Sequence, residues 1–170
     1  FDLYNQLLQE AVKELRGEKV PEKKAAAPLF DLRVDSYLPD DYIRDGREKV
    51  EIYRRLAMSE SLEEVKELAA EVRDRFGRMP EQVVYLFDLA MIRVKAAQLG
   101  IKEVQHNRTT MSIRFDNGSA LQGEQFAAWS RIFGKRLSFS TVAGLEIRID
   151  TKGLAPKDLV KSLKKALIGS

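Results

Sequence analysis

Residues 61–80, SLEEVKELAAEVRDRFGRMP, decide how the first half of the chain folds. Ser61 opens a Ser-x-x-Glu capping box, in which a hydroxyl accepts a hydrogen bond from the first helical turn. Gly77 suits the end of a helix, and Pro80 suits the first turn of the next one. Between these signals, apolar residues recur at three- and four-residue steps: Leu62, Val65, Leu68, Ala69, Val72 and Phe76. The stretch therefore predicts one helix over 61–76 and a second that begins at Pro80.

Acidic side chains gather on one side of the predicted 61–76 helix. At about 100° per residue, four of them form a stripe that faces away from the apolar side: Glu64, Glu67, Glu71 and Asp74. A solvent-facing helix is stabilised when acid and base alternate at four-residue steps, whereas like charges at such steps repel by roughly a few tenths of a kcal/mol. A basic partner relieves that repulsion, so the stripe suggests a docking surface. The alternative is an ordinary solvated helix face.

Helical periodicity continues to residue 100 and is then replaced by strand-like alternation. The pattern Asp45-x-x-Glu48 opens a helix before the quoted stretch, and a long central helix spans about 80–98 with Gly100 as its stop. Beyond Gly100, alternating apolar residues predict two hairpins, a helix around 124–133 between them and a final helix from Pro156. The predicted fold class is α+β: a helical half, then a β-β-α-β-β-α half with a mainly antiparallel sheet.

Three segments are expected from the composition along the chain. Residues 1–16 carry leucines at helical spacing, and the chain starts inside this pattern, as expected for a piece cut from a longer protein. Residues 17–28 contain two prolines and almost no large apolar side chain, which is typical of an exposed linker. Residues 29–170 form the predicted α+β domain. Its first residues alternate in a way that predicts a half-buried strand: Phe30, Leu32 and Val34.

The composition offers little material for catalysis. The chain of 170 residues has no cysteine and a single histidine, His106, which removes a thiolate zinc site and a cysteine nucleophile. Gly134-Lys135-Arg136 lacks the Ser or Thr of a nucleotide-binding loop, and Asp40-Asp41 follows a proline in a turn, where Asp commonly satisfies backbone donors. The first residues lack the basic start and apolar run of a signal peptide, and the sequence contains no apolar run of membrane length. We therefore expect a cytoplasmic, non-enzymatic chain with no cofactor, no metal and no membrane partner.

The basic residues concentrate towards the C-terminus. The net charge of the whole chain is +3, and residues 120–170 hold nine Lys and Arg against four Asp and Glu. Such a surface is ordinarily solvated, but it also allows an alternative function, a nucleic-acid-binding module. The candidate residues for that function are Arg131, Lys135, Arg136, Arg148, Lys161, Lys164 and Lys165.

Five sequence segments, in their order and spacing, carry a family resemblance. Residues 38–43 (LPDDYI), 52–57 (IYRRLA), 74–80 (DRFGRMP) and 97–101 (AQLGI) are similar to the C-terminal domain of the bacterial transcription-repair coupling factor family. Residues 1–11 resemble the helix that closes the family's translocase motor just before this domain. The resemblance covers residues up to 101; beyond them it rests on the order of the elements.

The resemblance implies a bacterial parent protein that uses ATP to translocate on DNA and acts in transcription-coupled repair. Such motors dislodge RNA polymerase stalled at damage and recruit the damage-recognition ATPase of nucleotide excision repair. In the family, the C-terminal domain has no motor residues and packs against an N-terminal module that resembles a repair helicase subunit, masking the binding site for that ATPase. Acidic residues on the helix that stops at the Asp-Arg-Phe-Gly motif belong to this autoinhibitory contact, and they match Glu71 and Asp74 here. Glu64 and Glu67 are weaker candidates.

Overall fold

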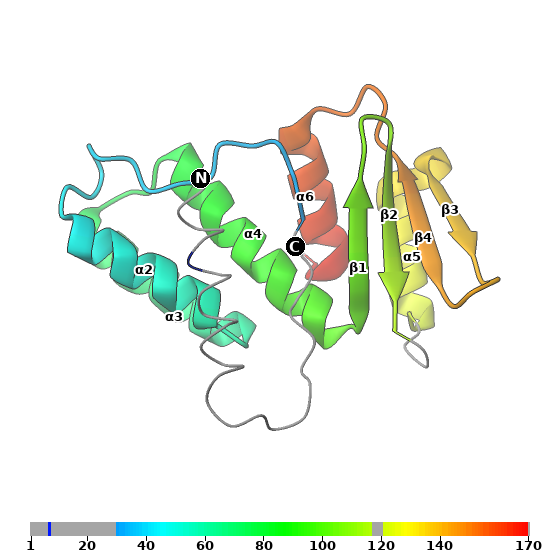
Figure 1. Ribbon diagram of the computed structural model, residues 1–170, viewed down its shortest axis with the longest axis horizontal. Helices are drawn as coiled ribbons and strands as arrows, with labels where there is room; N and C mark the ends of the chain where they lie inside the picture. The colour runs from blue at the N-terminus through cyan, green and yellow to red at the C-terminus, as the bar shows by residue number, and fades with distance from the viewer. Residues whose placement is uncertain (1–6, 8–29, 117–120, 170) are drawn as a thin grey trace. The chain divides into compact units, whose positions relative to one another are not determined.

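The computed structural model describes residues 7, 30–116 and 121–169 (Figure 1). The described residues divide into two compact units. Residues 34–91 belong to the first, called here the helical unit, and residues 30–33 and 92–169 belong to the second, the sheet unit. The predicted terminal helix and linker, residues 1–16 and 17–28, lie outside the described residues except for Leu7, so these boundaries stay a prediction.

The helical unit contains the helices that the quoted stretch and its neighbours predict. These are α2 (Gly46–Met58), α3 (Leu62–Phe76) and the first part of α4 (Glu81–Gln98). The side chain of Asp45 caps α2 by accepting from the Arg47 N–H, and the Ser61 hydroxyl caps α3 by accepting from the Glu64 N–H at 3.2 Å. The Glu64 carboxylate reaches back one residue further than a capping box requires, to the Glu60 N–H at 3.0 Å. Local capping chemistry therefore sets where both helices begin.

Gly77 ends α3 in a backbone conformation that favours glycine. Its φ is +89°, and its N–H donates to the Arg73 carbonyl oxygen at 2.9 Å. The Tyr42 hydroxyl donates to the Gly77 carbonyl oxygen at 2.7 Å, which ties the end of α3 to the segment before α2. Helices α2 and α3 contribute their inward residues to the core of this unit: Ile52, Tyr53, Leu56, Ala57, Val65, Leu68, Ala69 and Val72.

The sheet unit is built in the predicted order β-β-α-β-β-α. Its strands are β1 (Ile101–His106), β2 (Thr110–Phe115), β3 (Leu137–Ser140) and β4 (Glu146–Asp150), and its helices are α5 (Gly123–Phe133), the short 3-10 helix η1 (Gly134–Arg136) and α6 (Pro156–Leu167). All three strand pairings are antiparallel, in the order β1-β2-β4-β3. The α+β fold class and the antiparallel sheet are thus confirmed.

The two faces of the sheet have opposite chemistry. One face is apolar and fully buried at its centre, where Met111, Ile113, Ile147 and Ile149 are 0% exposed. Helices α5 and α6 pack against each other. Their Trp129 and Leu163 are also 0% exposed. The opposite face is polar and carries two ion pairs, Arg114–Glu103 at 3.0 Å and Arg148–Glu146 at 3.2 Å.

The predicted strand at residues 30–35 is wrong. The burial does alternate, since Leu32 and Val34 are buried while Asp31 and Arg33 are exposed. No strand of the described part of the chain pairs with this segment, however, and the Leu32 N–H donates to the Phe30 carbonyl oxygen at 3.0 Å in a three-residue turn. That local bond uses a donor that a sheet ladder would need, so the alternation reflects packing of side chains alone.

Candidate docking site

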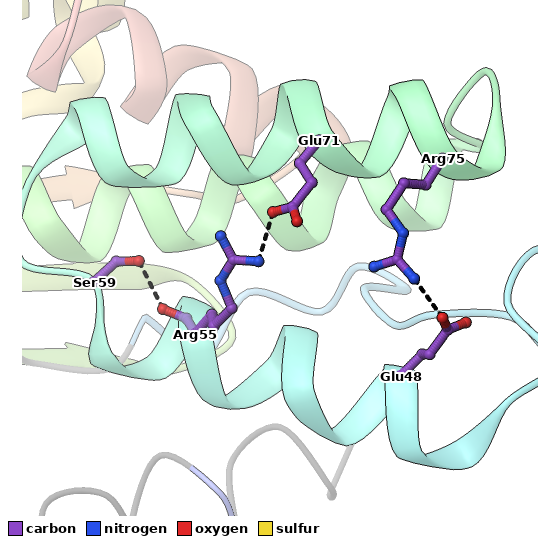
Figure 2. A network of polar contacts seen from close by, with 5 residues as sticks. All are labelled: Glu48, Arg55, Ser59, Glu71 and Arg75. Atoms are coloured by element: carbon purple, nitrogen blue, oxygen red, sulfur yellow. Dashed lines mark hydrogen bonds and ion pairs between the residues drawn. The ribbon is translucent and has the colours of Figure 1, made fainter.

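Helices α2 and α3 lie side by side and are cross-linked by two ion pairs (Figure 2). Glu48, near the start of α2, pairs with Arg75, near the end of α3; Arg55, in the last turn of α2, pairs with Glu71. An early residue of one helix thus meets a late residue of the other, so the two helices run antiparallel. Because Glu71 and Arg75 are one turn apart on α3, acid and base alternate along this edge.

The Arg55–Glu71 pair lies at the surface. The side chains of Arg55 and Glu71 are 44% and 41% exposed, so water screens much of their attraction. The turn that follows α2 is tied to the same residue, because the Ser59 hydroxyl donates to the Arg55 carbonyl oxygen at 2.7 Å (Figure 2). A pair of this exposure is worth about 0.2–1 kcal/mol, which an incoming basic side chain is able to match.

Two carboxylates of the predicted acidic stripe have a bonding partner in the structure, and the other two are called open here because they make no ion pair with a described residue. Glu71 is held by Arg55, and the carboxylate of Glu64 accepts from the Glu60 N–H. Glu67 and Asp74 are exposed and make no ion pair with any other described residue. They are seven residues apart, which places them on the same side of α3 about 10 Å apart. These two carboxylates are the ones most accessible to a basic partner.

Arg55 and Glu48 are the residues of this site that sequence reasoning missed. Their pairing with α3 depends on how two helices pack, and the periodicity of either helix alone carries no signal for it. The acid–base alternation absent within the stripe is supplied across the helix pair instead.

The candidate nucleic-acid-binding residues all belong to the sheet unit, and the contacts of Arg136 and Arg148 are well defined. One Nη of Arg136 donates to the carbonyl oxygens of Asp150 and Lys152, at 3.0 and 2.8 Å, and Arg148 pairs with Glu146. The others are distributed over α5, η1 and α6, exposed except for the half-buried Lys164: Arg131, Lys135, Lys161, Lys164 and Lys165.

Other residues considered for chemistry have structural contacts. His106 Nδ1 donates to the Asp31 carbonyl oxygen at 3.0 Å, and its Nε2 lies 3.4 Å from the Thr151 hydroxyl. Asp40 forms an ion pair with Lys49. Within the described ranges, no three His, Cys, Asp or Glu side chains are grouped so as to hold a metal ion, and no helix there is long and apolar enough to cross a membrane.

A comparison with protein families identifies the family of the chain. The model of the TRCF domain family matches residues 32–126, more than half of the sequence. The chain belongs to the TRCF domain family. This TRCF domain is 29% identical to the transcription-repair-coupling factor of Bacillus subtilis over 172 aligned residues, which cover 99% of the chain and 14% of that relative. It is 42% identical to the transcription-repair-coupling factor of Staphylococcus aureus (strain USA300) over 101 residues, which cover 59% of the chain and 9% of that relative.

A solved structure has the same fold. The TRCF domain superposes on the crystal structure of the C-terminal domain of transcription-repair coupling factor with a TM-score of 0.69 and 21% identity, covering 84% of this chain and 89% of that one. The resemblance drawn from the sequence motifs is therefore confirmed. The chain spans only about one seventh of the Bacillus subtilis relative.

Proposed function

We propose that this TRCF domain is a non-catalytic regulatory clamp within a longer bacterial transcription-coupled repair protein. It docks through α3 on an N-terminal module of the same protein and masks the site at which the excision-repair damage-recognition ATPase binds. The parent is an ATP-driven DNA translocase that acts on stalled RNA polymerase in the cytoplasm. The observation that carries this proposal is the acidic stripe of α3. Among the described residues, Glu67 and Asp74 make no ion pair there and Glu71 pairs with the exposed Arg55.

The exposure of the site suits a contact that opens and closes. An intramolecular partner acts at an effective concentration of order millimolar, so little intrinsic affinity is required. Exposed ion pairs of about 0.2–1 kcal/mol each hold such a latch and release it when another part of the protein moves. Charge complementarity of this kind also makes docking fast and sensitive to salt.

The structure supports different roles for the acidic residues. Asp74 and Glu67 meet basic side chains of the N-terminal module directly, because they have no partner to give up among the described residues. Glu71 joins the contact only by sharing or leaving Arg55. Glu64 contributes least, since its carboxylate already accepts from the Glu60 N–H in front of α3.

The test is a double substitution, Glu71→Ala with Asp74→Ala, in the full-length protein. We expect tighter binding of the damage-recognition ATPase and higher DNA-stimulated ATP hydrolysis, because the masked site is exposed. The matched control is Asp41→Ala with Glu51→Ala, which removes the same charge from exposed positions outside α3. If the α3 variant leaves binding of the damage-recognition ATPase unchanged, or if the control raises it equally, the clamp is refuted.

A further inference from the structure

The net charge of +3 conceals a strong division of charge between the two units. Residues 34–91, the helical unit, hold nine Lys and Arg against fourteen Asp and Glu, a net charge of −5. Residues 92–169 of the sheet unit hold fourteen Lys and Arg against six Asp and Glu, a net charge of +8, and its residues 30–33 add one charge of each sign. The sheet unit is therefore strongly cationic, although the net charge of the whole chain is only +3.

Four of these fourteen basic residues lie on the outer side of α6. At about 100° per residue, the lysines fall within an arc of about 100°, opposite the buried Leu159 and Leu163. They are Lys157, Lys161, Lys164 and Lys165. Steps of four residues put successive lysines about 6 Å apart along the helix. Asp158 is the single acidic residue of α6 and lies in its first turn, where a carboxylate stabilises the helix N-terminus.

A second element extends the lysines of α6 beyond the start of the helix. The two hydrogen bonds from Arg136 to the carbonyl oxygens of Asp150 and Lys152 hold η1 against the turn that leads to α6. Lys135 is the neighbour in sequence of Arg136, and Arg136 contacts the backbone of Lys152. The side chains of Lys135 and Lys152 are both exposed. We call the exposed set the lysine face: Lys135, Lys152, Lys157, Lys161 and Lys165.

The chemistry of the lysine face favours one class of partner. Membrane-surface helices insert an apolar side, but the apolar residues of α6 are buried within the sheet unit. Protein interfaces are anchored by aromatic and aliphatic side chains and are depleted in lysine. A phosphate backbone needs only a row of exposed cations, and lysine is a compact point charge suited to it. We propose that the lysine face binds the phosphate backbone of duplex DNA without reading its bases.

The structure also refines which cations take part. Arg136 and Arg148 are left out of the lysine face because each already has a partner: the backbone before α6 for Arg136 and Glu146 for Arg148. Lys161 and Lys165 are exposed and lie one turn apart on α6. This function is independent of the α3 clamp, since it uses a different unit and the opposite charge.

The test measures anisotropy of a fluorescein-labelled DNA duplex of mixed sequence with the 170-residue chain, titrated over a range of potassium chloride concentrations. The logarithm of the binding constant should fall linearly with the logarithm of salt concentration. Lys161→Gln with Lys165→Gln should lower the magnitude of that slope by about two, since each phosphate contact contributes about one. A duplex of unrelated sequence should bind equally well.

The matched control is Lys66→Gln with Arg78→Gln, which removes the same charge from exposed positions in the helical unit. It should leave the slope unchanged. A second pair, Lys135→Gln with Lys152→Gln, tests the part of the lysine face outside α6 and should also lower the slope. Absence of binding at the lowest salt overturns the proposal. A slope that neither lysine-face pair changes, or that the control lowers equally, overturns it too.

Discussion

Replacing Arg55 with Gln should strengthen docking of the domain on the N-terminal module of the same protein. Arg55 is not one of the docking residues that the sequence predicts. The Arg55 guanidinium holds Glu71 in the undocked domain. Docking that recruits Glu71 must therefore break or share this ion pair. Removing the guanidinium frees the carboxylate before the partner arrives, so the competing interaction no longer opposes docking.

The size of the effect follows from the exposure of the pair. With side chains 44% and 41% exposed, the interaction is worth about 0.2–1 kcal/mol. Because about 1.4 kcal/mol corresponds to a tenfold change in affinity, Arg55→Gln should lower the dissociation constant by about 1.4- to 5-fold. The measurement is calorimetric titration of the 170-residue chain with the separately produced N-terminal module.

Arg54→Gln is the matched control for this substitution. Arg54 is the adjacent residue, is exposed and forms no ion pair with another described residue, so its loss reproduces the change in net charge alone. Glu71→Gln should weaken docking more in the Arg55→Gln background than in the wild type, since the carboxylate contributes fully only there. Equal effects of the Arg54 and Arg55 substitutions, or weaker docking of Arg55→Gln, would refute the competition.

The sequence predicts those elements of this fold that local chemistry determines. Each of these signals is contained in a few consecutive residues. The structure confirms the helix caps at Asp45 and Ser61, the end of α3 at Gly77 and the change from helix to strand after Gly100. The order of the strands in the sheet cannot be predicted in this way. Alternation of apolar and polar residues specifies which face of a strand is buried but not which strand lies beside it. The position of β4 between β2 and β3 therefore required the structure.

The candidate site shows the same limit at the level of single side chains. Periodicity places Glu71 correctly on the polar side of α3, but it lies at the edge of that side, where α2 packs. The repulsion inferred within the acidic stripe is offset there by Arg55 and Arg75, across the helix pair and along α3. Helix α2, which begins 16 residues before α3, determines which carboxylates of α3 form ion pairs. The sequence of α3 alone therefore does not show which of them stay without a partner.

Three further predictions concern stability, each measured by urea unfolding. Gly77→Ala should destabilise the chain by about 1–3 kcal/mol because φ at this residue is +89°, and not because of a clash, since an added Cβ meets no atom within 4 Å. Its control is Gly46→Ala, at a position with equal space and no positive φ, which should be neutral or stabilising by about 0.4–1 kcal/mol. Leu56→Ala, at a side chain 0% exposed, should lower the free energy of unfolding by about 2–5 kcal/mol, whereas Met58→Ala, at one 42% exposed, should change it by about 0.5 kcal/mol or less. Tyr53→Phe should cost about 1–3 kcal/mol at neutral pH, because the buried Leu38 N–H loses the phenolic oxygen that it reaches at 2.8 Å. Burial raises the pKa of the Tyr53 phenol above 10.0, an effect that the Leu38 N–H partly opposes, so the folded chain holds this proton more tightly than the unfolded chain. The stabilisation linked to the phenol proton is therefore complete below pH 10.0 and is lost as the pH rises above it, so the wild type should lose more stability on going to alkaline pH than Tyr53→Phe does. Parallel pH profiles for the two proteins would contradict this assignment.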